Sequence, residues 1–231
     1  MIIKKVYFAL GLLILFFLNA CKKDTINEPE IPEEIPTAVT YPNYSNLKIG
    51  NYWIYQRFEL DGSGGETALA IIDSCFIEKD TLINGNTYFK YVSPNFGVNI
   101  SPSVNTPFVA EFFRDSLSYI VSSMGRIEFS SQDFTTIFYS FYGVAGPNDT
   151  VCRAEAQMKD QNISITTPAG TFVTSNFKET QYMYPNYTMN GAIKYRSRRY
   201  AENVGKITQD WYLFSQVPTR WERRLIRYHL N

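Results

Sequence analysis

The chain consists largely of short segments, from about residue 50 onward, in which apolar and polar residues alternate. An apolar side chain at every second position is the period of a β-strand with one buried face. The alternation predicts strands at the following positions: Tyr52–Glu59, Ala68–Ile77, Thr87–Val92, Leu117–Ser122, Arg126–Ser130, Thr136–Tyr142, Val151–Met158, Ile163–Thr166, Thr171–Thr180, Ile193–Tyr200, Gly205–Phe214 and Arg220–His229.

Turn-forming residues separate these segments, at Asp61–Gly65, Asn84–Asn86, Gly146–Asp149 and Pro185–Asn186. Glycine and asparagine accept the positive φ of tight hairpin turns, and proline fixes the entry to a turn. No window has a sustained helical period, and we expect at most one short helix, at Asn105–Phe113. The sequence therefore predicts a mainly β fold, an antiparallel meander that forms a barrel or a sandwich.

The first residues have the pattern of an export signal. Lys4 and Lys5 precede an uncharged apolar run, Val6–Leu18. This run is shorter than the ~20 residues that a membrane-spanning helix needs, and the order of basic, apolar and small residues is typical of a signal peptide. The run ends in Leu18–Cys21, which resembles a lipobox, the motif cleaved before a lipidated cysteine.

The lipobox predicts that residues 1–20 are a signal peptide and that Cys21 carries acyl chains such as palmitate. The alternative is a plain membrane anchor. Residues 21–42 are rich in proline and glutamate, and such a segment buries too little apolar surface to fold. We expect it to act as a semi-stiff tether, followed by a single β-rich domain at residues 43–231. Lys22–Asp24 resembles a surface-export signal, so the predicted outer-membrane lipoprotein faces either the periplasm or the cell surface.

Charge and composition narrow the partners. Removal of residues 1–20 takes away two lysines and leaves 20 basic against 22 acidic residues, a net charge of −2. A near-neutral balance argues against nucleic acid as a partner. The 17 Tyr and 17 Phe residues favour strands, in which aromatic rings pack across a pleated surface.

Two cysteines remain in the predicted domain, Cys75 and Cys152. An oxidising compartment permits a disulfide between them, and the alternative is a pair of buried free thiols. The only histidine, His229, stands near the end of the chain. A histidine-based triad or zinc site needs more than this one imidazole, so we expect no metal, no cofactor and no enzymatic activity.

The remaining catalytic alternative is a hydrolase that works without histidine, through a pair of carboxylates. The sequence pairs none of its strand carboxylates with another. Those in or near predicted strands are Asp73, Glu111, Asp115, Glu155 and Asp210.

Arginine and aromatic residues cluster in the last forty residues and predict an interaction surface. Its members are Arg196, Arg198, Arg220, Trp221, Arg223 and Arg227. Alternation places Arg196 with Arg198 on one face of their strand, and Arg223 with Arg227 on one face of the last predicted strand. Arginine beside aromatic rings suits an anionic glycan, a lipid headgroup or a protein. The alternative is a set of ion pairs with the acidic N-terminal half.

An Asp–Ser/Thr–aliphatic pattern recurs and resembles the O-glycosylation motif of secreted Bacteroidota proteins. The hydroxyls in this pattern belong to Thr25, Thr81, Ser116 and Thr150. Asp-Ser and Asp-Thr pairs are also ordinary turn residues.

Three further motifs resemble those of a family of uncharacterised β-rich lipoproteins of Bacteroidota. They are the G-x-x-W-x-Y pattern at Gly50–Tyr55, P-A-G-T-F at Pro168–Phe172 and Y-A-x-x-V-G at Tyr200–Gly205. The resemblance implies the fold and the location and assigns no chemistry. We therefore expect a membrane-anchored binding or interaction module for a small ligand, a glycan or an outer-membrane protein. A structural subunit of an outer-membrane complex is the alternative.

Overall fold

The structure is a computed structural model that describes residues 39–61, 63–95, 108–212 and 220–231. Residues Thr40–Asn231 form one compact unit. The predicted signal peptide, Cys21 and nearly all of the predicted tether lie outside the described residues.

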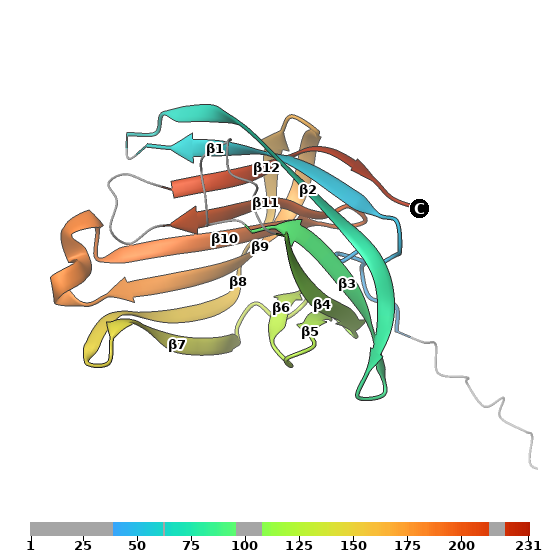
Figure 1. Cartoon of the computed structure of the whole chain (residues 1–231), viewed down its shortest axis with the longest axis horizontal. Coiled ribbons are helices and arrows are strands. Elements are labelled where there is room, and N and C mark those ends of the chain that lie inside the picture. The colour runs from blue at the N-terminus through green and yellow to red at the C-terminus, as the bar shows by residue number, and fades with distance from the viewer. Residues whose placement is uncertain (1–38, 62, 96–107, 213–219) are drawn as a thin grey trace, which may run out of the picture. The chain divides into compact units, whose positions relative to one another are not determined.

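Twelve strands make one antiparallel sheet in the order β6-β5-β4-β3-β2-β1-β12-β11-β10-β9-β8-β7 (Figure 1). The strand bounds are β1 Tyr52–Leu60, β2 Glu66–Ile83, β3 Asn86–Pro94, β4 Phe108–Ser116, β5 Tyr119–Ser122, β6 Ile127–Ser130, β7 Ile137–Gly146, β8 Asp149–Thr167, β9 Gly170–Met183, β10 Ile193–Ala201, β11 Gly205–Tyr212 and β12 Arg220–His229. The mainly β prediction is confirmed.

The predicted short helix at Asn105–Phe113 is wrong for the part that the structure describes. Phe108–Ser116 is strand β4, which pairs with β3 through the partners Phe89 and Phe113. Phe112 and Phe113 are both half-buried, so both faces of this strand carry apolar residues and the two-residue period is lost. Among the described residues the one helix is a 3₁₀ turn, η1, at Pro185–Asn190.

β8 is a single strand where the sequence predicts two, at Val151–Met158 and Ile163–Thr166. Its pairing with β9 is irregular between Lys159 and Ile163. Asp160 and Asn162 have φ values of 49° and 58° within this irregularity. Asp and Asn tolerate the left-handed conformation better than other side chains, so a bulge stands where the sequence indicates a break.

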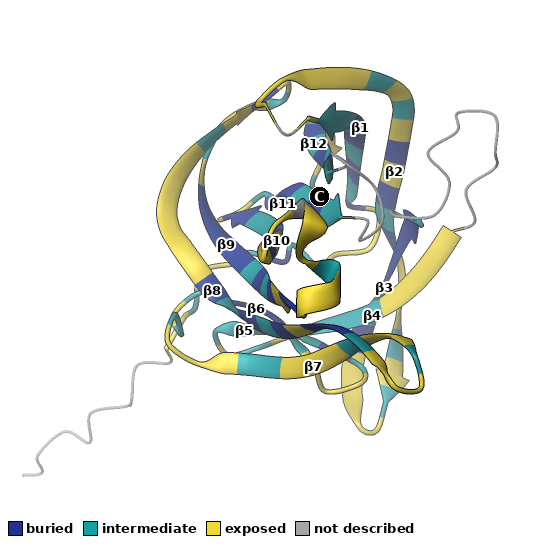
Figure 2. Ribbon diagram, turned by 90° about the vertical axis from the view of Figure 1, so that its left-hand side faces the viewer, coloured by how far each residue is buried: buried dark blue, intermediate teal, exposed yellow. Residues whose placement is uncertain are grey.

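The curved sheet closes through side chains, because its two ends, β6 and β7, are not neighbours in the ladder. Phe129 on β6 contacts Tyr200 on β10, with ring centroids 4.7 Å apart. The backbone N–H of Ser130 donates to the sulfur of Met158 on β8 at 3.3 Å. Figure 2 shows the strands arranged around a central interior, with buried segments lining it and exposed stretches on β7 and β8. The sheet is therefore barrel-like rather than a sandwich.

An apolar cluster fills the interior near the start of β1. The Trp53 indole Nε1 donates to the Val204 carbonyl at 2.7 Å, and the rings of Trp53 and Tyr91 lie 6.2 Å apart. The tip of the long β8–β9 hairpin joins this cluster, since the N–H of Ala169 donates to the Leu225 carbonyl of β12 at 3.1 Å.

Gly205 is predicted to be essential to this packing. Its φ is +102°, and an added Cβ would meet the Trp53 indole at 3.1 Å. We expect Gly205→Ala to lower the free energy of unfolding by about 1–3 kcal/mol through backbone strain, and by more through the clash, in urea unfolding. The matched control is Gly85→Ala, where φ is +77° and the Cβ meets open space. Equal losses in the two variants would contradict the role of the Trp53 contact.

Candidate functional site

Charged side chains share the interior of the barrel with the aromatic ones. Arg57 alternates with the buried Trp53 and Tyr55 along β1. Its Nε donates to both carboxylate oxygens of Asp73 on β2, at 3.1 and 2.9 Å, and its Nη2 donates to Asp73 Oδ1 at 2.8 Å. The two side chains are 3% and 1% exposed. A bidentate pair of this kind satisfies charges whose burial would otherwise be costly.

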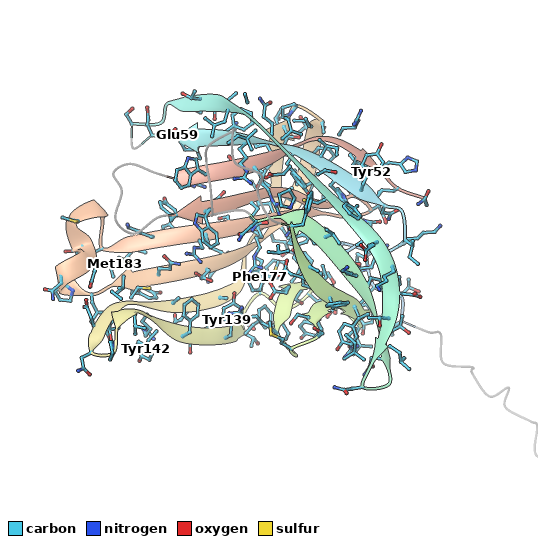
Figure 3. The ribbon with its side chains drawn as sticks, in the orientation of Figure 1. Tyr52, Glu59, Tyr139, Tyr142, Phe177 and Met183 are labelled. Carbon is cyan, nitrogen blue, oxygen red and sulfur yellow. The ribbon has the colours of Figure 1, made fainter. Side chains whose placement is uncertain are left out.

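The interior contains a cavity of about 220 Å³ that we call the charged cavity. It is lined by Glu111, Arg126, Tyr139, Glu179, Arg196, Arg198, Gln209, Asp210 and Trp211. These residues come from β4, β7, β9, β10 and β11, together with Arg126 just before β6. Figure 3 labels Tyr139 together with Phe177 of β9, whose ring lies 6.0 Å away.

A second space, the aromatic cavity, adjoins the apolar cluster. It is lined by Ser45, Leu47, Trp53, Tyr55, Tyr91, Phe113, Ile120, Glu128, Tyr200 and Lys206. Its volume is about 40 Å³, room for a few water molecules at the ~10–15 Å³ of such volume that one water needs. The aromatic cavity is thus too small for an organic ligand. A third cavity of about 250 Å³, lined among others by Tyr44, Asp115 and Phe129, has no charged side chain besides Asp115, so the charged cavity is the candidate site for a polar ligand.

Two polar links separate the cavities. The Arg198 guanidinium of the charged cavity pairs with the Glu128 carboxylate of the aromatic cavity. Lys206 Nζ donates to Gln209 Oε1 at 3.2 Å, and Arg223 Nη2 donates to the same oxygen at 2.7 Å. These links hold Arg198 and Gln209 in fixed positions on the wall of the charged cavity.

Two arginines of the charged cavity have unused hydrogen-bonding capacity. The Arg126 guanidinium lies over the Tyr139 ring, 3.9 Å from its centroid; the residue is exposed, and its guanidinium forms no ion pair with another described residue. The Arg196 guanidinium lies 4.2 Å from the Trp211 ring. Its Nη1 is 3.5 Å from Glu179 Oε1, and its buried Nε has no partner among the described residues.

A carboxylate oxygen in the same cavity is also unsatisfied. Asp210 is 3% exposed, and its Oδ2 accepts a hydrogen bond from Arg220 Nε at 3.1 Å. Its Oδ1 has no hydrogen-bond partner among the described residues. Burial raises the pKa of the Asp210 carboxyl to about 6, against the opposing effect of Arg220.

Lys206 lies on the wall between the cavities, and its pKa is strongly shifted. Burial, reinforced by the positive charges of Arg223 and Arg198, lowers the pKa of the Lys206 amine to about 7. The ammonium lies 5.5 Å from the Tyr91 ring centroid and 5.8 Å from that of Tyr200. Lys206 is half-buried, and these ring faces compensate only part of the cost of taking its charge out of water.

The predicted interaction surface is wrong for two of its members, because Arg223 and Trp221 are 2% and 4% exposed. Arg196 and Arg198 share a face, as predicted, but this face lines the charged cavity. Arg223 and Arg227 do not share a face, because Tyr55 pairs with Leu225 and Ile54 with Arg227, which leaves an extra residue in β12. Arg227 is consequently exposed, while Arg220 pairs with Asp210.

The alternative prediction, ion pairs with the N-terminal half, is confirmed for two arginines. Their pairs reach the first half of the chain: Arg223 lies 4.0 Å from Asp73, and Arg224 lies 2.6 Å from Glu66. A third pair, Arg198 with Glu128, lies within the second half. The clustered arginines therefore serve mainly the interior and the cross-strand pairs of the sheet.

The predicted disulfide is wrong, since Cys75 and Cys152 are both buried and free. They belong to separate apolar clusters, and Cys75 accepts a 3.6 Å contact from Arg223 Nη1. His229 stacks on Tyr52 at 5.5 Å and does not line the charged cavity.

The predicted glycosylation sites remain predictions. Thr81, Ser116 and Thr150 are half-buried, and Thr25 lies outside the described residues. No group of three or more His, Cys, Asp or Glu side chains in the described ranges is placed to hold a metal ion. In the same ranges no helix has the length and hydropathy needed to cross a bilayer.

Sequence analysis did not single out Arg126, Tyr139, Glu179 and Gln209 of the charged cavity. Alternation assigns each to a face of its strand, but it does not show which face lies inside a curved sheet. Glu179 and Gln209 do lie in register with residues of β10, at Arg196 and Arg198, and this pairing depends on the tertiary fold.

No protein-family profile matches the chain, and no curated protein does either. Among solved structures, the chain is similar to a "putative lipoprotein" from Parabacteroides distasonis ATCC 8503, with 16% identity and a TM-score of 0.44. The match covers 83% of this chain and 100% of that one. A "putative exported protein with YmcC-like fold" from Bacteroides fragilis NCTC 9343 matches at 13% identity and a TM-score of 0.44, over 81% of this chain and 99% of that one.

The lowered pKa of the Lys206 amine predicts that the stability of the protein depends on pH. Below pH 7 the amine is charged in the folded protein and in the unfolded chain, and the folded protein bears the full cost of taking this charge out of water. Between pH 7 and ~10 the folded protein has lost this proton while the unfolded chain still binds it, so this contribution to stability rises with pH. Lys206→Met should therefore raise the free energy of unfolding by about 1–2 kcal/mol at pH 6 and by less at pH 9, in urea unfolding.

The control for this prediction is Lys79→Met, at an exposed position of β2. An increase that is equal at the two pH values, or equal in the two variants, would contradict the burial of the Lys206 charge.

Proposed function

We propose that this protein is an extracytoplasmic lipoprotein, anchored through lipid on Cys21, whose barrel binds a small polar ligand in the charged cavity. The observation that carries the binding role is the charged cavity itself. It places the unsatisfied Arg196 Nε and Asp210 Oδ1 beside aromatic rings in one partly open space. A concave site with a few convergent polar groups is typical of small-molecule binding.

The sequence supports the anchoring role. Residues 4–18 have the order of a secretory signal, and Cys21 follows Leu18-Asn19-Ala20 as in a lipobox. One acyl chain gives only marginal membrane binding, whereas two or three chains give stable attachment. The lipid would then supply all membrane contact, and the domain would be left to bind its ligand.

The size of the charged cavity limits the ligand. Its volume of about 220 Å³ lies below the ~300–1,000 Å³ of sites for drug-sized molecules. A ligand of monosaccharide or amino-acid size fits this space, and a polymer would have to enter by one residue.

A second candidate function, an accessory subunit of an outer-membrane complex, is favoured by one exposed row of residues. Tyr142, Arg153, Tyr182 and Ile193 stand side by side across β7, β8, β9 and β10. Tyr142 is 62% exposed and Ile193 47%. Aromatic and aliphatic side chains beside an arginine are common in protein interfaces, so this row is a suitable surface for a protein partner.

Lipidation is predicted to hold the protein on the membrane. We expect the wild-type protein to sediment with membranes and to carry the added mass of diacylglycerol and acyl chains on its N-terminal peptide. Cys21→Ser should remove the thiol that accepts the lipid, so the N-terminal peptide should carry no lipid and cleavage after residue 20 should be blocked. An unmodified N-terminal peptide beginning at Cys21, measured by mass spectrometry, would contradict the anchor.

A bound small molecule is predicted in the protein purified from its native cells. Native mass spectrometry should show an additional mass that gentle activation removes. We expect Arg126→Trp to abolish this mass, because the indole occupies the charged cavity without the donors of the guanidinium. Arg227→Trp, at a position that is exposed like Arg126 but does not line the cavity, is the matched control and should retain the ligand. Loss of the mass in both variants, or its retention in both, would place the ligand elsewhere.

A further inference from the structure

We infer that the charged cavity binds a small molecule bearing an oxyanion beside hydroxyl groups, which is the chemistry of an acidic monosaccharide. This inference rests on the proposed function and names the class of its ligand. The oxyanion is a carboxylate or a phosphate, since both offer oxygen pairs that match the planar edge of a guanidinium.

The oxyanion is recognised by Arg126 and Arg196. Each guanidinium lies against an aromatic ring, Arg126 on Tyr139 at 3.9 Å and Arg196 on Trp211 at 4.2 Å. A guanidinium covered on one face still has its N–H groups directed outward in its own plane. The buried Nε of Arg196 has no hydrogen-bond partner among the described residues, and the guanidinium of Arg126, an exposed residue, forms no ion pair with them. Both residues line the same cavity.

The carboxylates of the cavity do not oppose an anion as strongly as their number suggests. Glu179 Oε1 already accepts a hydrogen bond from Gln181 Nε2 at 2.6 Å. Asp210 is paired with Arg220. Glu111 is exposed, so water screens its charge. These partners leave the buried Nε of Arg196 as the strongest attraction for an anion, and Arg126 adds a positive charge at the exposed side of the cavity.

The hydroxyl groups are recognised by Asp210. Its Oδ1 is buried and has no donor among the described residues, and a buried acceptor is normally satisfied. Sulfate, which carries no proton at neutral pH, cannot supply this donor, whereas a sugar hydroxyl can. A ligand with both groups would therefore satisfy the guanidinium donors and the carboxylate acceptor of one cavity together.

The experiment is isothermal titration calorimetry of the full-length protein, purified in detergent, with four probes: glucuronate, glucose 6-phosphate, glucose and inorganic sulfate. We expect glucuronate or glucose 6-phosphate to bind at least about tenfold more tightly than glucose, because hydrogen bonds to a charged group are the stronger kind. Binding of only one acidic sugar identifies the oxyanion as carboxylate or as phosphate. Sulfate should bind about tenfold more weakly than the better acidic sugar.

Two variants locate the binding. Arg126→Gln should weaken the better acidic sugar by about tenfold or more and leave glucose binding unchanged. Arg126 forms no ion pair with a described residue, so this variant keeps the pairs of the fold. Arg227→Gln, the same change at an exposed position, should leave all affinities unchanged. Circular dichroism confirms that each variant is folded.

The outcomes separate this inference from the proposed function. If glucose and both acidic sugars bind equally and Arg126→Trp abolishes all three, the recognition of an oxyanion is overturned. The proposal that the charged cavity binds a ligand would still stand. If sulfate binds as tightly as the acidic sugars, the inference that the cavity recognises hydroxyl groups is overturned. No measurable binding of either acidic sugar overturns the inference, while an additional mass in native mass spectrometry would still support the proposed function.

Discussion

The Arg198–Glu128 ion pair joins two parts of the sheet that backbone hydrogen bonds do not connect. Glu128 lies on β6, at one end of the strand order, and Arg198 on β10, near the other end. The Phe129–Tyr200 contact lies beside it. Removal of one partner from a fully buried pair leaves an uncompensated charge that costs ~3–5 kcal/mol, and the cost is smaller here because the Arg198 side chain is 23% exposed. The curvature of the sheet, and with it the interior, therefore depends on a polar contact as well as on ring packing.

This ion pair also determines which part of the interior is hollow. On one side of it, Trp53, Tyr55 and Tyr91 fill the barrel and leave about 40 Å³. On the other side, large charged residues line about 220 Å³. Guanidinium and carboxylate groups pack less completely than apolar side chains because each must keep its hydrogen-bonding edge available. A barrel with charged residues on its inner face thus retains space that an apolar core would close.

The strands of this fold could be predicted from the sequence, because a period of two is a local property. Trp53 and Tyr55 alternate with half-buried neighbours as the sequence indicates. The interior charges could not be predicted, because their partners are distant in the chain: Arg198 and Glu128 are 70 residues apart. A signal was nevertheless present. Arg57 continues the phase of Trp53 and Tyr55, and Arg223 stands between the buried Trp221 and Leu225. A charge in phase with buried apolar residues indicates a polar interior, whereas sequence analysis assigned such charges to the surface. The bulge that turns Arg227 outward depends on pairing with β1 and has no local signal.

The unsatisfied groups of the charged cavity account for both a cost in stability and a gain in binding. A buried donor or acceptor without a partner costs ~1–3 kcal/mol relative to one that is hydrogen-bonded. Arg196 Nε and Asp210 Oδ1 bear this cost in the folded protein. A ligand that supplies the missing hydrogen-bond partners removes this cost, and its removal makes binding more favourable. The rings of Tyr139 and Trp211 hold Arg126 and Arg196 in place beforehand, and less side-chain entropy is then lost on binding. The features that make this interior a poor core for stability are therefore those that suit it to bind a small charged molecule.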